Sequence, residues 1–203
     1  MAIEGTARWF FPIVLRNFRY FLGDGWNLYL LHTGYNEPFI AEQFGSWDIV
    51  RFQCVHPKIN AAVFNMLCKD AELWKMIKEE RVLVLEADTI ACKPFSDEWL
   101  RWDMIGAPCG EKMSVLNGGL SLRRRWCMIE ALRRYSGVLL DEQEDVWFTK
   151  ALRLMDANLP NGYDAGRFAV ESFYYEQPFG VHGTDKNYLP LTVAEKIVRQ
   201  IEF

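Results

Sequence analysis

The chain of 203 residues lacks several features that mark common classes of protein. Its five cysteines form no C-x-x-C pair, which argues against a disulfide framework or a zinc site and favours a reducing compartment. The sequence has no N-x-[ST] glycosylation sequon. Its longest early apolar run, residues 9–15, contains Pro12 and is too short to span a bilayer. We therefore expect no membrane span and a cytoplasmic location.

Positive charge is also scarce. The 23 Lys and Arg residues face 27 Asp and Glu residues, so the net charge of −4 gives a nucleic-acid partner no electrostatic support. The one basic cluster, Arg123-Arg124-Arg125, is interpreted as a solvated helix start. G-x-G-x-x-G and Walker patterns are absent as well, which leaves dinucleotide dehydrogenases and P-loop enzymes without support.

The residues that are present describe a globular chain. Half of them are apolar and 15% are aromatic, which is enough for one large domain with a substantial core. Predicted strands alternate with predicted helices in the first half, and this order favours an α/β fold with a largely parallel sheet. The expected strands are residues 26–31, 48–53, 82–85 and 103–107, and the expected helices are residues 11–22, 59–77 (broken near Asp70), 124–135 and 144–155. A loop-rich region, 156–190, and a last helix from Thr192 complete the prediction.

An acidic pair, Glu86 and Asp88, follows the apolar run 82–85. Ligands of open α/β sheets bind just beyond the carboxyl ends of strands, and residues two apart on a strand share one face. Two carboxylates there suit a hard cation such as Mg²⁺ or Mn²⁺, which often bridges substrate phosphates. The alternative is a solvated strand end with one carboxylate capping a turn. His182, in a Gly-flanked loop, is the candidate third ligand, although a lone histidine is more often structural or on the surface.

Two other segments could contribute chemistry. The glycines of Asn117-Gly118-Gly119 would let the backbone approach a ligand closely, and the Asn117 amide can bind hydroxyls; the alternative is a bulge or hairpin turn. Glu144 and Asp145 begin a predicted helix, where capping and the helix dipole account for most acidic residues. A carboxylate held there in a pocket can serve as a general base, with Asp145 the first choice and Glu144 the second.

The order of these motifs resembles that of the GT-A-type glycosyltransferases of the DUF5672-like group, and is similar in particular to the glycosyltransferase domain encoded by chlorella viruses. The resemblance implies a single glycosyltransferase domain over residues 1–203, with a GT-A (nucleotide-diphospho-sugar transferase) fold. This fold is a Rossmann-like α/β domain whose mixed, largely parallel central sheet is flanked by helices. A viral protein of this kind would act in the host cytoplasm. The last predicted helix reaches Phe203 without a tail, from which we expect an N-terminal domain of a longer chain.

The resemblance also implies an activity. It implies metal-dependent transfer of a hexose or deoxyhexose from a nucleotide-sugar donor, with a UDP-sugar as the default, to a carbohydrate hydroxyl in glycan synthesis, with inversion favoured. Mn²⁺ or Mg²⁺ would bind at Glu86-Ala87-Asp88, the family's D-x-D position, and at His182. Thr6 and Arg8 fall where such folds hold the nucleotide base. The segment Asn117 to Gly119 would orient the donor sugar.

Two other functions remain open at this stage. One is a nucleotide-sugar hydrolase that uses the same metal site, and the other is a non-catalytic glycan-binding domain on a degenerate GT-A fold. The expected partners are a nucleotide-sugar and a glycan acceptor, without nucleic acid. The expected assembly is a monomer or a weak oligomer.

Overall fold

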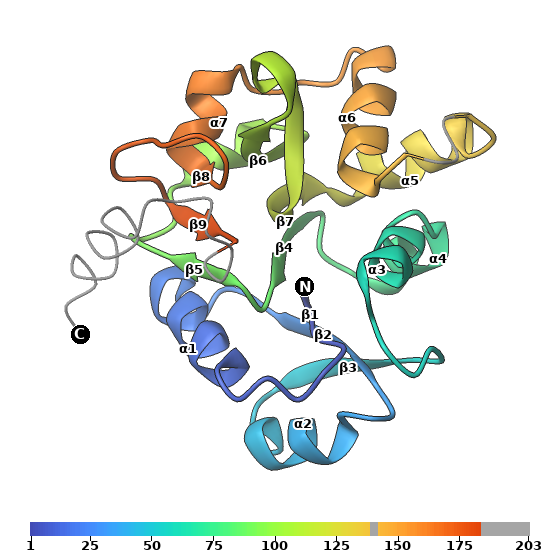
Figure 1. Ribbon diagram of the computed structural model, residues 1–203, viewed down its shortest axis with the longest axis vertical. Coiled ribbons are helices and arrows are strands. Elements are labelled where there is room, and N and C mark those ends of the chain that lie inside the picture. Colours follow the sequence, from blue (N-terminus) through green and yellow to red (C-terminus); the bar gives the residue numbers. More distant parts are fainter. Residues whose placement is uncertain (139–141, 184–203) are drawn as a thin grey trace.

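The computed structural model describes residues 1–138 and 142–183. A six-stranded sheet runs through the middle of the molecule, in the order β3-β2-β1-β4-β7-β6 (Figure 1). Its strands are β1 (Ala2–Ile3), β2 (Leu28–Thr33), β3 (Ile49–Cys54), β4 (Arg81–Glu86), β6 (Met104–Cys109) and β7 (Val115–Arg124).

The sheet is mixed but largely parallel, as predicted. Strands β3, β2, β1 and β4 are parallel, whereas β7 runs antiparallel to both β4 and β6. Ile3 in β1 lies opposite Leu31 in β2 and Glu86 in β4. The carboxyl ends of these strands therefore meet at one edge of the sheet, where ligands of α/β proteins bind.

The core fills both faces of this sheet. Alternate residues of β4 point to opposite faces, so Val82 and Val84 belong to one apolar cluster and Leu83 and Leu85 to the other. The first cluster is covered by α3 (Ala61–Cys68), α4 (Ala71–Met76), α5 (Arg125–Tyr135) and α6 (Glu144–Leu154). The second is covered by α1 (Phe11–Leu22), α2 (Glu37–Phe44), the 3-10 helix η1 (Asp97–Arg101) and α7 (Gly162–Phe168). This burial on both faces explains why β4 reads as a continuous apolar run.

A second, three-stranded sheet lies beside the first. It consists of β5 (Thr89–Ala91), β9 (Gly180–His182) and β8 (Ala169–Val170), in the order β5-β9-β8. Thr89 pairs with His182, which brings the end of the described chain back to the residue that follows Asp88. The loop-rich prediction for residues 156–190 missed β8, β9 and the seven-residue helix α7, because elements this short leave little periodic pattern in the sequence.

Two predicted helix boundaries and the absence of a membrane span can be compared with the structure. The break near Asp70 is confirmed, since Asp70 Oδ1 accepts a hydrogen bond from the Glu72 N–H at the start of α4. The prediction of a solvated helix start at residues 123–125 is wrong for Arg123, which is fully buried near the end of β7. It is confirmed for Arg124 and Arg125, which are partly exposed and are the N-cap and the first residue of α5. The predicted helix from Thr192 lies outside the described residues. Across residues 1–138 and 142–183, no helix has the length and apolar character needed to cross a membrane.

Candidate active site

The carboxyl edge of the parallel strands opens into a cleft of about 640 Å³. The ends of β1 and β4, a bulge in β7 and the start of α6 all contribute to its walls. Every candidate site residue from the sequence lines this cleft: Thr6, Arg8, Glu86, Asp88, Asn117, Gly118, Gly119, Glu144, Asp145 and His182. The fold thus gathers residues that are far apart in the chain, while their roles stay predictions.

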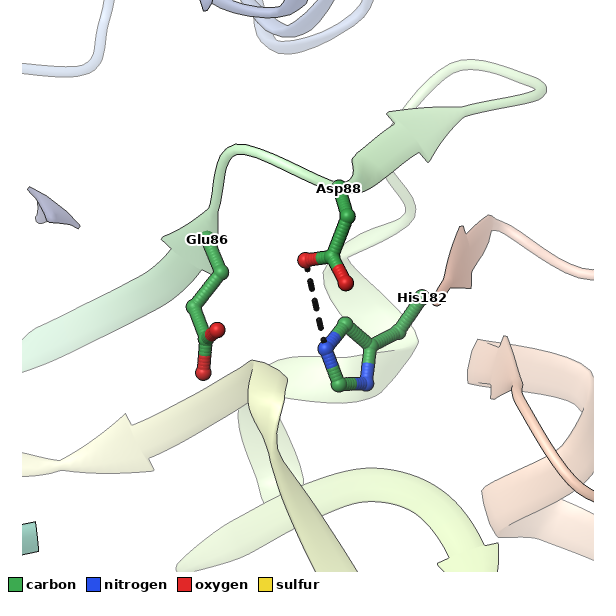
Figure 2. Close-up of side chains that lie close together, drawn as sticks. All are labelled: Glu86, Asp88 and His182. Atoms are coloured by element: carbon green, nitrogen blue, oxygen red, sulfur yellow. Dashed lines mark ion pairs between the residues drawn. The ribbon is translucent and has the colours of Figure 1, made fainter. Parts of the chain in front are cut away.

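The candidate metal ligands form a compact cluster. Glu86 ends β4, Asp88 lies in the turn before β5, and His182 ends β9 (Figure 2). One ligand atom from each lies within 4.8 Å of the others, and His182 Nε2 is 3.5 Å from Asp88 Oδ1. Two carboxylates and one imidazole are a donor set that suits Mn²⁺ and, with more water, Mg²⁺. The side chains present therefore fit a divalent cation.

A third carboxylate, Glu171, lies on the other side of the His182 ring. Its Oε1 atom is 3.4 Å from Nδ1 of His182. Burial alone would lower the pKa of His182, but the facing carboxylates Asp88 and Glu171 raise it to about 9. Sequence analysis missed Glu171, which lies in no motif and reaches the site only through the pairing of β8 with β9.

The Asn-Gly-Gly segment forms a bulge in β7. The register against β6 shifts between Gly106 and Pro108, and Asn117 Oδ1 accepts a hydrogen bond of 2.8 Å from the Gly119 N–H. The sequence left two structural alternatives to a ligand-binding role for this segment, a bulge and a hairpin turn, and the structure has the bulge. A Cβ on Gly118 would lie 1.8 Å from Glu144 Oε1, and one on Gly119 would lie 2.3 Å from His182 Nε2. Both glycines therefore make room for side chains of the protein itself.

Beneath the bulge, Arg123 and Glu144 form a buried ion pair. Arg123 Nη1 and Nη2 donate to the two carboxylate oxygens of Glu144 at 2.7 and 2.9 Å. Arg123 also donates to the Gly118 carbonyl oxygen and the Ser121 hydroxyl. Sequence analysis missed this role of Arg123, because an arginine within a basic triplet reads as a surface residue.

Asp145 is placed differently from its neighbour Glu144. Its Oδ1 accepts a hydrogen bond from the Val146 N–H in the first turn of α6, and the residue lines the cleft. Burial and the adjacent Glu144 charge raise the pKa of Asp145. A raised pKa makes a carboxylate a better proton acceptor.

Glu4, just beyond β1, is a further acidic residue that sequence analysis did not select. Its Oε1 accepts hydrogen bonds from the Thr6 N–H and hydroxyl, at 2.6 and 2.8 Å. In the part of the chain that the structure describes, its buried Oε2 makes no hydrogen bond, and Arg8 Nε lies 3.9 Å away. Burial raises the pKa of Glu4. A buried, incompletely bonded carboxylate in a cleft is typical of functional sites.

The fold is similar to that of the apo-form glycosyltransferase GlyE of Streptococcus pneumoniae TIGR4. The TM-score is 0.57 at 11% sequence identity, over 100% of this chain and 59% of that chain. A second structure of glycosyltransferase GlyE from the same organism gives 0.47 at 12% identity, over 100% and 60% of the two chains. This chain thus spans about three fifths of those proteins. The first likeness shows the fold alone, which is GT-A as predicted.

Comparison of the sequence with known proteins gives one family match and no curated relative. The curated proteins contain no match to the chain, and its expected likeness to the chlorella virus domain stays a prediction. A family model described as "Protein of unknown function (DUF5672)" matches residues 50–182, which include Glu86, Asp88, the β7 bulge, the start of α6 and His182. Because this match covers more than half of the sequence, the chain belongs to the DUF5672 family.

Proposed function

We propose that this chain is a metal-dependent glycosyltransferase that moves a sugar from a nucleotide-diphosphate donor to a carbohydrate hydroxyl. The observation that carries the proposal is the convergence of Glu86, Asp88 and His182 on one cleft at the carboxyl edge of a GT-A sheet. A UDP-sugar is the first donor to test, and glycan synthesis is the setting in which such a transfer belongs.

The charge of the cleft supports metal dependence. Glu4, Glu86, Asp88, Asp145 and Glu171 all line it. Among described residues, the only Lys or Arg in its lining is Arg8. The Glu144 charge is already balanced by Arg123. A diphosphate would be repelled by this surface, since unit charges at 4 Å interact by about 4 kcal/mol near a protein surface. A divalent cation would convert the repulsion into attraction.

The residues of the chain would divide the work. Glu86, Asp88 and His182 would hold Mn²⁺ or Mg²⁺, which when bound supplies Lewis-acid stabilisation of charge on a departing diphosphate. Asn117 would orient hydroxyls of the donor sugar from the β7 bulge. Asp145 would accept the proton of the acceptor hydroxyl, on a route that inverts the sugar.

The nucleotide end of the donor would lie at the end of β1. Thr6 and Arg8 line that part of the cleft, and Gly118 and Gly119 form the β7 wall. Glu144 would hold Arg123 beneath the β7 bulge and would not accept a proton from the acceptor, because both of its oxygens are bound by Arg123. Asp145 therefore remains the preferred base of the two.

Calorimetric titration tests this proposal. We expect wild-type protein to bind Mn²⁺, to bind UDP or GDP in the presence of Mn²⁺, and to lose nucleotide binding in EDTA. Asp88→Asn and His182→Gln should weaken Mn²⁺ binding by at least 10-fold. His56→Gln, which changes a half-buried histidine outside the cleft, is the matched control. Wild-type affinities in Asp88→Asn would contradict the proposed metal site.

Product analysis separates the remaining alternatives. With Mn²⁺, a nucleotide-sugar and a glycan acceptor, a transferase yields an extended glycan. Release of free sugar with no transfer in any acceptor panel would identify a hydrolase instead. Glycan binding that is unaffected by Mn²⁺ or EDTA, with no nucleotide binding, would identify a non-catalytic domain.

A further inference from the structure

His182 lies between two carboxylates that face different atoms of its ring. Asp88 Oδ1 is 3.5 Å from Nε2, and Glu171 Oε1 is 3.4 Å from Nδ1. The side chain of His182 is 4% exposed and that of Glu171 is 12% exposed, so water provides little competition for either contact. Within the described residues, neither ring nitrogen makes a hydrogen bond of ordinary geometry.

The two ring nitrogens are not equivalent in this arrangement. Nε2 faces the side of the ring where Asp88 lies, as Figure 2 shows. Nδ1 instead faces Glu171, which is outside the cluster of three candidate ligands. A neutral imidazole that binds a metal through one nitrogen carries its hydrogen on the other, and the partner of that hydrogen decides which nitrogen is free to bind.

Backbone pairing brings His182 and Glu171 close to each other. His182 pairs with Thr89 across β5 and β9, and Val181 pairs with Val170, which directly precedes Glu171. On the β7 side the ring packs against Gly119, where even a Cβ atom would lie 2.3 Å from Nε2. Packing against Gly119 therefore limits displacement of the ring, and the carboxylates of Asp88 and Glu171 favour the orientation in which both ring nitrogens face them.

We propose that Glu171 is a positioning residue, which accepts a hydrogen bond from Nδ1–H of His182 and so presents Nε2 to a divalent metal beside Glu86 and Asp88. The inference rests on the metal site of the proposed function and adds the residue that orients its histidine. Carboxylate partners of this kind fix the tautomer and ring orientation of metal-bound histidines, and their loss costs about 10- to 100-fold in metal affinity.

Calorimetric titration with Mn²⁺ alone tests the role of Glu171 without any assay of activity. Glu171→Ala should weaken Mn²⁺ binding by about 10- to 100-fold. Glu171→Gln should recover most of the affinity, because its amide oxygen still accepts from Nδ1–H. Glu176→Ala removes an exposed carboxylate from the same loop, which controls for the change in net charge and should bind as wild type does.

A spectroscopic measurement reports the tautomer directly. Long-range ¹H–¹⁵N spectra of protein labelled at its three histidines and saturated with diamagnetic Zn²⁺ should show His182 protonated at Nδ1 and metal-bound at Nε2. His182→Gln assigns the signal, and His32 and His56 provide internal references.

The outcomes separate this inference from the proposed function. Equal Mn²⁺ affinity in wild type and Glu171→Ala would overturn the positioning role and leave the metal site standing. An equally large loss in Glu171→Gln and Glu171→Ala would also overturn it, since charge rather than hydrogen bonding would then matter. A Zn²⁺-bound Nδ1 would do the same. Failure of folded wild-type protein to bind Mn²⁺ would overturn the proposed function itself.

Discussion

Two buried groups of charged residues flank the β7 bulge, and they differ in how their charge is balanced. Beside Gly118, the carboxylate of Glu144 is met by the bidentate guanidinium of Arg123. Beside Gly119, the His182 imidazole faces the carboxylates of Asp88 and Glu171 and lies close to Glu86, and the one Lys or Arg among the described residues that line this cleft is Arg8. Removing an ion from water costs several kcal/mol unless it is paired. The first group is complete within the chain, whereas the second has negative charge left for a cation to neutralise.

The largest expected effect comes from breaking the balanced group. Glu144→Ala leaves Arg123 as an uncompensated charge that is 0% exposed, and the free energy of unfolding should fall by about 3–5 kcal/mol. Urea unfolding, followed by tryptophan fluorescence, measures this loss.

A surface ion pair gives the matched control for this experiment. Lys75→Ala breaks the exposed pair of Glu72 and Lys75, and should cost no more than about 1 kcal/mol. If Glu144→Ala proved as mild as Lys75→Ala, the contrast between the two buried groups would lose its energetic basis.

Gly119→Ala should have an intermediate effect, because it changes the packing of the group around His182. The new Cβ would lie 2.3 Å from His182 Nε2, so the ring must move. We expect a loss of about 1–3 kcal/mol in unfolding free energy and weaker Mn²⁺ binding in calorimetry. Gly25→Ala, where nothing lies within 4 Å of the added atom, is the control. Unchanged Mn²⁺ affinity in Gly119→Ala would mean that the ring position does not matter for the site.

The smallest effect is expected at Glu4, which is buried without a full set of hydrogen bonds. Because burial raises its pKa above the ordinary value of 4.5, the unfolded chain releases this proton first and stability falls as the pH rises above 4.5. Glu4→Gln removes that loss. Its melting temperature should match the wild type near pH 4 and exceed it at pH 7 by about 2–4 °C, for a gain of about 1 kcal/mol.

Differential scanning calorimetry at the two pH values makes this measurement. Glu72→Gln, which changes an exposed carboxylate, should show no such divergence between pH 4 and pH 7. A Glu4→Gln variant that is less stable than wild type at both pH values would show that the carboxylate is required for folding. Glu4 would then resemble Glu144, whose charge the fold requires, and not the carboxylates around His182.

In each of the two groups the sequence predicts some members and misses another. Glu86 and Asp88 follow an apolar run whose burial is a local property, and a search for a third ligand led to His182. Arg123 and Glu171 could not be found in this way, since both depend on contacts between distant segments. Most helices were predicted from apolar spacing, whereas the short strands that bring Glu171 to His182 depend on pairing across the fold.

The brevity of β1 has a consequence for how the protein assembles. This strand has only two residues, yet it joins β2 to β4 at the centre of the sheet by pairing the start of the chain with Leu85 and Glu86. The pairing of β1 with β4 closes a longer loop than the pairing of β6 with β7, which are close in sequence, and so carries a larger loop-closure cost. Glu4 and Glu86 meet at the cleft only when β1 has docked between its neighbours. A chain in which β1 has not docked therefore lacks one wall of the cleft, so two residues of strand decide whether the binding site is complete.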